Sequence, residues 1–538
     1  MIARIRRARR RFAARLAAVL ALAVVLPASL TACSGLFGGG ETLRVLAGSE
    51  VKDLEPLLED MTRETGVRLE FEYIGTLDGT EALLASGDDR PWDATWFPSN
   101  RYLTLFPDGQ DLIRTSESIA RSPVVLGLKP AVAQRLGWGA DSQPTWNDVV
   151  DAIAAGELSY GMTSPISSNS GFTTLVQMTT ALSGTGTVLE TGDIAATAPL
   201  LERFAQGQGL ASGSSGWLLD RFVEDPGAVD GIFNYESVLA GVEVEGAPLE
   251  LVIPSDGVVT SDYPLTLLAS ADDEAAERYE KVVEWLLRDD VQERIAEDTN
   301  RRTTATPPAL DAQVFELPFP NRVDTVQTLL QTWLAEVKKP SNMVFAIDTS
   351  GSMGDGTRMD ELRAALDVLA GSQEAEGSAG FLRLQPRERI TFLEFAETLK
   401  SEFAVDIPAD DAGYAEAIAE IDAHVRGYSP TGGTAMYDTV AAAYEAAVEG
   451  ADDDSISSIV VFTDGESNQG MSDRDFERWY EDFVAAHPAA ERIPVFTVHF
   501  GDSNEDELEA LAELTGGRLF DAKSESLAAA FREIRGYL

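Results

Sequence analysis

One stretch decides the fold of the C-terminal part of the chain: Met343-Val344-Phe345-Ala346-Ile347-Asp348-Thr349-Ser350-Gly351-Ser352. Its apolar half is typical of a buried strand. Its polar half is a D-x-S-x-S pattern, which places one carboxylate and two hydroxyls in a single tight turn. Three hard oxygen donors held together in this way are suited to a small divalent cation. Taken alone, the pattern also fits a capped helix start, because Asp and Ser are favoured N-caps.

Two later segments strengthen the metal-site interpretation. Pro430-Thr431-Gly432-Gly433-Thr434 forms a Gly-rich turn before the helical pattern 435–447, and the apolar run 458–463 ends at Asp464. All three segments follow strands or open helices, which is the crevice side of an open α/β sheet, where ligands bind. An EF-hand does not fit, because Met353 and Met359 stand where the turn glycine and the bidentate Glu belong.

Together these segments resemble the von Willebrand factor A domain and its metal-ion-dependent adhesion site. The resemblance implies that Mg²⁺, or another small divalent cation, is held directly or through water by five residues. These residues are Asp348, Ser350, Ser352, Thr434 and Asp464. It further implies that a protein partner offers a carboxylate to the free coordination position.

The C-terminal module is expected to span residues 338–538 and to alternate strands with helices. Predicted strands are 343–348, 389–395, 458–463, 494–500 and 518–521. Predicted helices are 358–369, 412–424, 435–448, 475–486, 505–515 and 526–534. This alternation predicts a doubly wound, mostly parallel, Rossmann-like α/β sheet. The connection Lys338-Lys339-Pro340-Ser341 is short, which predicts a fairly fixed relation to the preceding module.

The preceding module, residues 43–337, is also predicted to be α/β. Strands are expected at 43–47, 67–73 and 94–96, and helices at 53–65, 274–287, 290–297 and 324–337. Several phrases resemble a periplasmic-type solute-binding protein, among them Gly161-Met162-Thr163-Ser164-Pro165 and Phe233-Asn234-Tyr235-Glu236-Ser237. The resemblance implies a two-lobed module that holds a solute between its lobes.

The best ligand candidate in this module is the run Ser167-Ser168-Asn169-Ser170-Gly171. Hydroxyls and free backbone N–H groups at a helix start form a nest for anions and oxygen atoms. The family pattern extends the candidate ligand residues to Ser49, Ser99, Ser168, Asn169, Ser170 and Tyr235. A small solute or an oxyanion is the expected ligand. Simple helix capping remains an alternative for each of these residues.

The N-terminus has the layout of a secretory signal. Residues 1–32 carry no acidic residue and seven Arg, all within the first fifteen residues, and the apolar run 16–30 that follows these Arg is short for a membrane span. Leu30-Thr31-Ala32-Cys33 resembles a bacterial lipobox, which implies cleavage and lipidation at Cys33, the single cysteine of the chain. Residues 33–42 would then be the lipidated Cys and a flexible tether. We expect an extracytoplasmic lipoprotein anchored to the cell membrane by that lipid, exported by the Sec or the twin-arginine route.

Composition narrows the functional classes. The chain holds 42 basic and 89 acidic residues, a net charge of −47, so a nucleic-acid binder is not expected. It has three His and no G-x-S-x-G, Walker A or H-E-x-x-H motif, so an enzyme is not expected either.

The favoured function is therefore a cell-surface lipoprotein that binds a protein or another ligand through a Mg²⁺-dependent adhesion site. Two alternatives remain open: the substrate-binding receptor of a membrane transporter, and a scaffold or assembly factor that works with an AAA+ ATPase.

Overall fold

The computed structural model describes residues 41–87, 90–140, 142–305, 314–369, 383–451, 455–523 and 527–537. The expected signal peptide, Cys33 and nearly all of the expected tether lie outside these residues. Within the described part of the chain, no helix is both long enough and apolar enough to cross a membrane.

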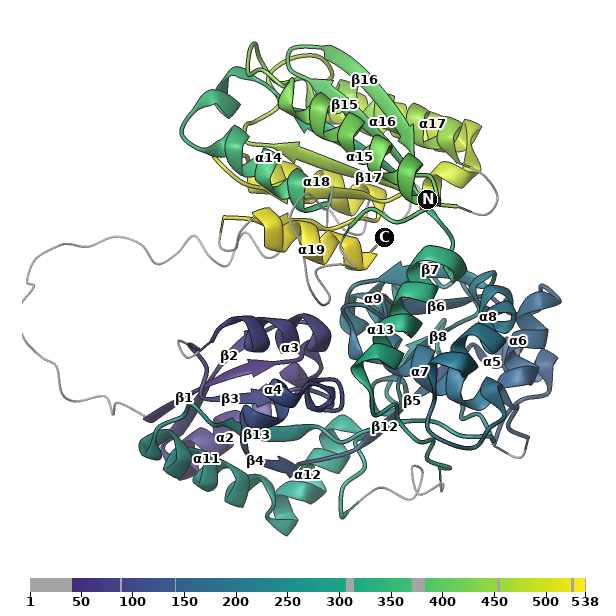
Figure 1. Cartoon of the computed structure of the whole chain (residues 1–538), viewed down its shortest axis with the longest axis vertical. Coiled ribbons are helices and arrows are strands. Elements are labelled where there is room, and N and C mark those ends of the chain that lie inside the picture. The colour runs from purple at the N-terminus through teal and green to yellow at the C-terminus, as the bar shows by residue number, and fades with distance from the viewer. Residues whose placement is uncertain are drawn as a thin grey trace, which may run out of the picture. The chain divides into compact units, whose positions relative to one another are not determined.

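The first lobe is built on a five-stranded sheet of order β2-β1-β3-β13-β4. Its strands are β1 (Glu41–Ala47), β2 (Val67–Tyr73), β3 (Ala94–Trp96), β4 (Ile113–Ser118) and β13 (Pro264–Leu268). Its helices are η1 (Ser49–Leu54), α2 (Glu55–Thr65), α3 (Thr76–Ala85), η2 (Leu103–Leu105), α4 (Pro107–Asp111), α11 (Asp273–Leu286) and α12 (Asp289–Thr299). Alternate residues of β1 face opposite sides of the sheet. Val45 packs with α2 and α11, and Leu46 packs with Leu83 of α3. In Figure 1, α2 and α11 lie below β1 and α3 lies above it.

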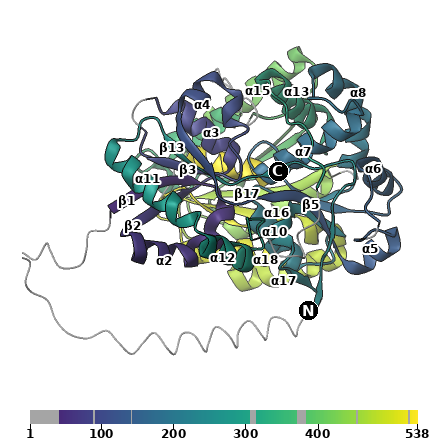
Figure 2. The same cartoon turned by 90° about the horizontal axis from the view of Figure 1, so that it is seen from below.

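The second lobe is built on a six-stranded sheet in which β11-β5-β8-β6-β7 are neighbours and β12 also pairs with β5. Its strands are β5 (Ser122–Leu128), β6 (Tyr160–Thr163), β7 (Gln208–Ser212), β8 (Gly231–Tyr235), β11 (Glu250–Val252) and β12 (Thr260–Ser261). Its helices are α5 (Pro130–Leu136), α6 (Trp146–Ala154), α7 (Asn169–Ser183), α8 (Thr191–Ala205), α9 (Ser215–Glu224), α10 (Glu236–Leu239) and α13 (Val323–Thr332). A small hairpin, β9 (Glu243–Val244) with β10 (Ala247–Pro248), completes it. The main core gathers Trp146, Phe204, Phe233 and Trp333. Figure 2 labels the helices α6, α7, α8 and α13 of this lobe.

The chain passes between the two lobes more than once. It leaves the first lobe after β4 and enters the second at β5, and it returns between β12 and β13. At these crossings Arg121 pairs with Arg302 in an isolated β-bridge, and half-buried Arg302 forms an ion pair with buried Glu236 (2.7 Å). The connections are thus short segments beside one another, the arrangement expected of a two-lobed module.

The C-terminal module has a six-stranded sheet of order β16-β15-β14-β17-β18-β19, of which β15, β16 and β17 are labelled in Figure 1. The strands are β14 (Ser341–Asp348), β15 (Arg389–Phe395), β16 (Leu399–Asp406), β17 (Ile456–Thr463), β18 (Val495–His499) and β19 (Leu519–Asp521). All neighbours pair in parallel except β15 and β16. The helices and helical turns are η5 (Gly351–Gly354), α14 (Arg358–Leu369), α15 (Asp411–Arg426), α16 (Met436–Gly450), α17 (Asp473–Ala486), η7 (Pro488–Arg492), α18 (Glu505–Thr515) and α19 (Leu527–Tyr537).

Helices cover both faces of this sheet, as a doubly wound fold requires. Phe345 of β14 faces α14, α15 and α19, whereas Val344 and Ala346 face α16, α17 and α18. Such a strand is buried on both sides, which explains why the sequence of β14 reads as a continuous apolar run rather than an alternating one.

Within the C-terminal module, the sequence prediction missed one strand, β16. Along this strand exposed and half-buried side chains alternate, and none is fully buried. Even the apolar Leu399 is exposed. It lies at the edge of the sheet and runs antiparallel, directly after a short turn from β15. A half-exposed edge strand rich in polar residues gives a weak apolar pattern, so it reads as a loop. The helix expected at 324–337 also differs: α13 ends at Thr332 and continues as a π-turn, Trp333–Val337.

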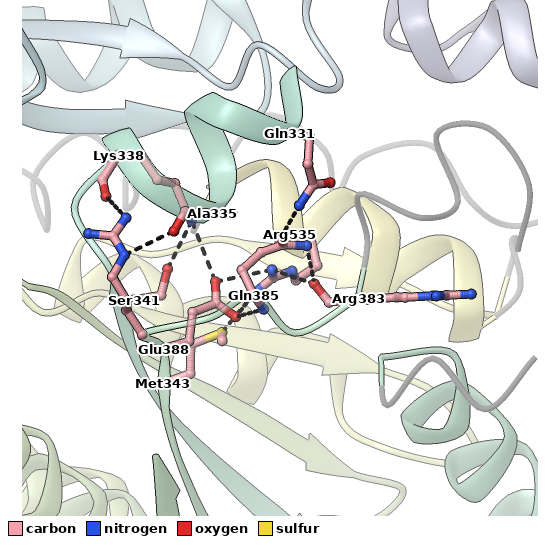
Figure 3. Close-up of polar contacts among 10 residues, drawn as sticks. Gln331, Ala335, Lys338, Ser341, Met343, Arg383, Gln385, Glu388 and Arg535 are labelled. Carbon is pink, nitrogen blue, oxygen red and sulfur yellow. Dashed lines mark hydrogen bonds and ion pairs between the residues drawn. The ribbon is translucent and has the colours of Figure 1, made fainter. Parts of the chain in front are cut away.

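A buried cluster of charges holds the junction between the two modules (Figure 3). Glu388 is fully buried and accepts hydrogen bonds from Arg535 of α19 at 3.1 and 3.2 Å. Lys338 lies 3.6 Å from the same carboxylate. Arg387 donates to the backbone oxygens of Ala335 and Lys338, both at 3.0 Å. The last turn before the connection is therefore tied directly to the C-terminal module.

Candidate metal site and ligand cleft

The candidate metal site lies at the point where the C-terminal sheet reverses its strand order. Asp348 is the last residue of β14, and Asp464 follows β17. These two strands are neighbours and parallel, so their carboxyl ends meet at the same edge. Connections from β14 and β17 lead away to opposite sides, which leaves the crevice that ligands of such sheets occupy.

The structure brings the five predicted metal ligands together. Ser350 Oγ lies 3.1 Å from Ser352 Oγ, and the Ser352 hydroxyl donates to Asp464 Oδ1 at 2.8 Å. The hydroxyls of Ser352 and Thr434 flank Gly465, at 3.6 and 3.8 Å from the position that a Cβ would take there. Ser352 is partly exposed, whereas the remaining donors are buried, so the cluster opens at one point.

The spacing of these oxygens suits a small octahedral cation. Ligands about 2.1 Å from Mg²⁺ at right angles stand about 3.0 Å apart. The separations of 2.8 and 3.1 Å around Ser352 are close to that value. Two carboxylates and three hydroxyls also match the hard-oxygen preference of Mg²⁺. Among the described residues, no group of three or more His, Cys, Asp or Glu side chains forms a metal site, so the hydroxyls are essential to this donor set.

Backbone hydrogen bonds fix the two turns that carry the donors. Gly351 N donates to Gly432 O at 3.0 Å, and Thr431 N donates to Thr349 O at 2.8 Å. Asn468 Oδ1 accepts a hydrogen bond from Thr434 N at 3.0 Å. The D-x-S-x-S turn and the Gly-rich turn, more than eighty residues apart in the sequence, are therefore joined as one rigid wall.

Asp348 is held as a buried acceptor. Its Oδ1 accepts from Ser350 N and its Oδ2 from the Thr463 hydroxyl, both at 2.6 Å. Burial raises the pKa of the Asp348 carboxyl to about 6, against the opposing effect of these hydrogen bonds. A buried carboxylate of this kind gains most from a nearby positive charge.

Sequence reasoning missed Arg358, the first residue of α14. Its guanidinium lies 2.6 Å from Asp464 Oδ2 and 2.7 Å from Asp502 Oδ2. These ion pairs raise the pKa of Arg358. One of the two site carboxylates is therefore already paired with a fixed positive charge. The sequence pattern places Arg358 near the same edge, because it opens a helix shortly after D-x-S-x-S, but the pattern does not show that it pairs with Asp464.

A second candidate site lies in the N-terminal module. A cavity of about 430 Å³ opens there, with residues from both lobes in its wall. The lobes touch beside it: the Ser215 hydroxyl donates to Glu50 Oε1 at 2.7 Å, and Leu77 N donates to Ser167 O at 3.4 Å. The cavity is of a size suited to a small ligand.

The predicted ligand residues of this module fall into two groups. Ser49 and Ser168 line the cavity. The other four, Ser99, Asn169, Ser170 and Tyr235, do not line the cavity and form hydrogen bonds within the protein instead. Asn169 donates to Tyr235 and Ser261, Ser170 bonds to Thr163 and Ser168, and Ser99 accepts from Arg101 N. Cavity residues that sequence reasoning missed include Lys52, Thr76, Ser214 and Arg518.

Comparison with known proteins agrees with the fold of the C-terminal module. Residues 342–533 match the family model described as von Willebrand factor type A domain. A curated relative, the uncharacterized protein sll0103 of Synechocystis sp., is 28% identical over 182 residues, which cover 34% of the chain and 37% of the relative. The chain thus spans little more than a third of that relative's length. A solved von Willebrand factor type A structure from Catenulispora acidiphila aligns at 20% identity and a TM-score of 0.29, over 37% of the chain and 43% of that structure.

Other solved structures are similar to the N-terminal part. The periplasmic binding protein P5PA aligns at 16% identity and a TM-score of 0.43, over 55% of the chain and 100% of that protein. The periplasmic binding protein AfuA from Actinobacillus pleuropneumoniae, solved with fructose-6-phosphate, aligns at 14% identity and a TM-score of 0.42, over 56% of the chain and 99% of that protein. Identities this low carry no functional statement from these proteins to the chain.

Proposed function

We propose that the chain is an extracytoplasmic lipoprotein that binds a protein partner through a divalent cation held at the edge of its von Willebrand factor type A domain. The observation that carries this proposal is the gathering of Asp348, Ser350, Ser352, Thr434 and Asp464 at the reversal point of the sheet. Mg²⁺ is the cation that these oxygens fit best.

The charge at this site supports a carboxylate as the partner's contribution. Asp464 shares its charge with Arg358, so the protein offsets the cation's two charges incompletely. A bound Mg²⁺ would therefore keep positive character toward the solvent, and an outside carboxylate would complete its shell. Ser352 is the partly exposed donor and marks the open side. This is binding chemistry, and we propose no catalytic role.

The experiment that tests this function uses glutarate as a minimal carboxylate probe. The metal-stripped chain is titrated with glutarate in the absence and in the presence of Mg²⁺, and binding is followed by NMR of the probe. Glutarate binding that requires Mg²⁺, and that Thr434→Ala weakens, supports the proposal. Equal binding with and without Mg²⁺ contradicts it.

We further propose that the N-terminal module binds a small ligand between its lobes. The cavity of about 430 Å³, walled by both lobes, supports this second role. A solute that binds the closed form of the module more tightly than the open form would then shift the equilibrium toward the closed form. Native mass spectrometry of the purified chain tests this proposal, because a retained small molecule would add a defined mass.

A further inference from the structure

The cavity of the N-terminal module has one wall residue from the C-terminal module. Arg518, which directly precedes β19, lines it together with Lys52 and Ser168. The Arg518 guanidinium lies over the ring of Phe520, 5.3 Å from its centroid. A residue at the end of the C-terminal sheet thus faces the space between the two lobes.

Helix α19 meets the same edge of the cavity. A Cβ at Gly536 would stand 2.9 Å from Ser167 Oγ, 3.7 Å from Ser167 Cβ and 3.1 Å from Gly213 Cα. Beside it, Trp217 of α9 packs against the core of the C-terminal module, and the Arg221 side chain of α9 comes close to Gly516. Three contacts therefore place the C-terminal module against the second lobe, next to the cavity.

The cavity wall favours a negatively charged ligand. Three helices of ten or more residues, α3, α7 and α9, begin at it, with N-caps Gly75, Ser168 and Ser214 in the wall. Helix N-termini carry partial positive charge and free N–H groups. In addition, Thr76 Oγ1 is buried and makes no hydrogen bond within the described protein, which leaves a donor for a ligand.

Carboxylates in the same wall do not outweigh these groups. Glu50 accepts a hydrogen bond from Ser215, and burial raises the pKa of Glu50, which favours its neutral form. Glu72 accepts a hydrogen bond from Trp92 Nε1 at 2.7 Å. Glu72 and Asp78 are the two remaining acidic wall residues, and the two positive charges of Lys52 and Arg518 offset them, which leaves the three helix N-termini as the excess positive character.

We propose that the cavity binds a small oxyanion, and that Arg518 of the C-terminal module is one of its ligands. This inference rests on the proposed ligand role of the cleft and goes beyond it, because it makes the site incomplete without the second module. The ligand then stabilises the docked arrangement of the two modules, and docking raises the affinity for the ligand by the same factor.

The first test uses inorganic phosphate and citrate as probes, titrated by calorimetry into the full chain. Arg518→Gln is expected to weaken binding about tenfold or more, the cost of about 1.4 kcal/mol that a charge-assisted contact carries. Arg474→Gln, an exposed Arg on α17, is the matched control and should leave binding unchanged. Equal binding by wild type and Arg518→Gln overturns the two-module site but leaves a ligand role for the cleft. Absence of binding of both probes to the wild type overturns the oxyanion assignment itself.

The second test asks whether the two modules meet at the cavity. A Cβ at Gly536 would lie 3.7 Å from Ser167 Cβ, a separation within the range of a disulfide. In a Cys33→Ala chain, Ser167→Cys with Gly536→Cys should therefore form a disulfide on mild oxidation, and phosphate should accelerate it. The control pair, Ser167→Cys with Glu449→Cys on the other face of the sheet, should remain reduced. A failure of the first pair to form a disulfide, with the chain folded, overturns the proposal.

Discussion

The Arg358 guanidinium lies 2.6 Å from Asp464 Oδ2, while Asp464 Oδ1 accepts the Ser352 hydroxyl at 2.8 Å. One carboxylate thus faces a fixed cation on one side and the candidate metal site on the other. Because Arg358 also pairs with Asp502, its position does not depend on Asp464 alone. The relationship suggests that Arg358 moderates how strongly the site attracts a divalent cation.

Arg358→Gln should therefore tighten Mg²⁺ binding. Removing a positive charge a few ångströms from the site relieves repulsion, and partial exposure of Arg358 limits the gain to about tenfold, or about 1.4 kcal/mol. Calorimetric titration of Mg²⁺ into the metal-stripped variant and wild type measures this, with Arg474→Gln as control. Weaker binding in Arg358→Gln would mean that the residue mainly orients Asp464.

Mg²⁺ should stabilise the folded chain more than Ca²⁺ at equal concentration. The turns that carry the donors are tied by short backbone hydrogen bonds, so the site cannot widen easily to the longer bonds that Ca²⁺ prefers. A ligand at a hundred times its Kd adds about 2.7 kcal/mol to the free energy of unfolding. Thermal unfolding with each cation, and with EDTA, measures the difference. Equal stabilisation by both ions would indicate a wider site.

The junction cluster predicts a dependence of stability on alkaline pH. Burial lowers the pKa of Lys338 to about 8, below its ordinary value of 10.5. Between these two values the unfolded chain holds more protons than the folded one, so stability rises with pH in this window. The effect is at most about 1.4 kcal/mol per pH unit.

Lys338→Met should abolish this dependence and leave the protein at least as stable as wild type at pH 7, because Glu388 keeps its ion pair with Arg535. The measurement is the thermal midpoint of both proteins from pH 7 to pH 10. If the thermal midpoints of wild type and variant changed equally with pH over this range, the pKa of Lys338 would not be lowered by burial.

The anchor can be tested independently of both binding sites. Cys33→Ala should release the chain from the membrane fraction, because each lipid chain contributes about 0.8 kcal/mol per buried CH₂ and the variant has none. Cell fractionation followed by immunoblotting gives the distribution. A variant that stays wholly in the membrane fraction would argue against the lipoprotein assignment.

Much of the C-terminal module could be predicted from the sequence. Strand and helix patterns there are long and regular, and helices 358–369 and 505–515 have the predicted bounds. The meeting of the five candidate donors could also be predicted, because each follows a strand or opens a helix and such positions meet at one edge. The prediction of a two-lobed α/β module followed by a doubly wound domain is likewise confirmed.

Other features depend on packing that the sequence pattern does not carry. Arg358 pairs with Asp464 only because of the direction in which α14 leaves the turn. Arg518 reaches the cavity only because two modules dock, and no local pattern records that contact. Asn169 and Tyr235 were predicted as solute contacts, but in the structure they bond to each other at 3.0 Å, away from the cavity wall.

Above all, we propose that Asp348 and its neighbours hold a cation, and calorimetric titration of Mg²⁺ into the metal-stripped full chain measures this. We expect one saturable Mg²⁺ site in the wild type. We expect no such site in Asp348→Ala, whose circular dichroism should match the wild type because the residue lies at a strand end. An absence of Mg²⁺ binding to the wild type, with or without glutarate present, or undiminished binding to Asp348→Ala, would contradict the claim.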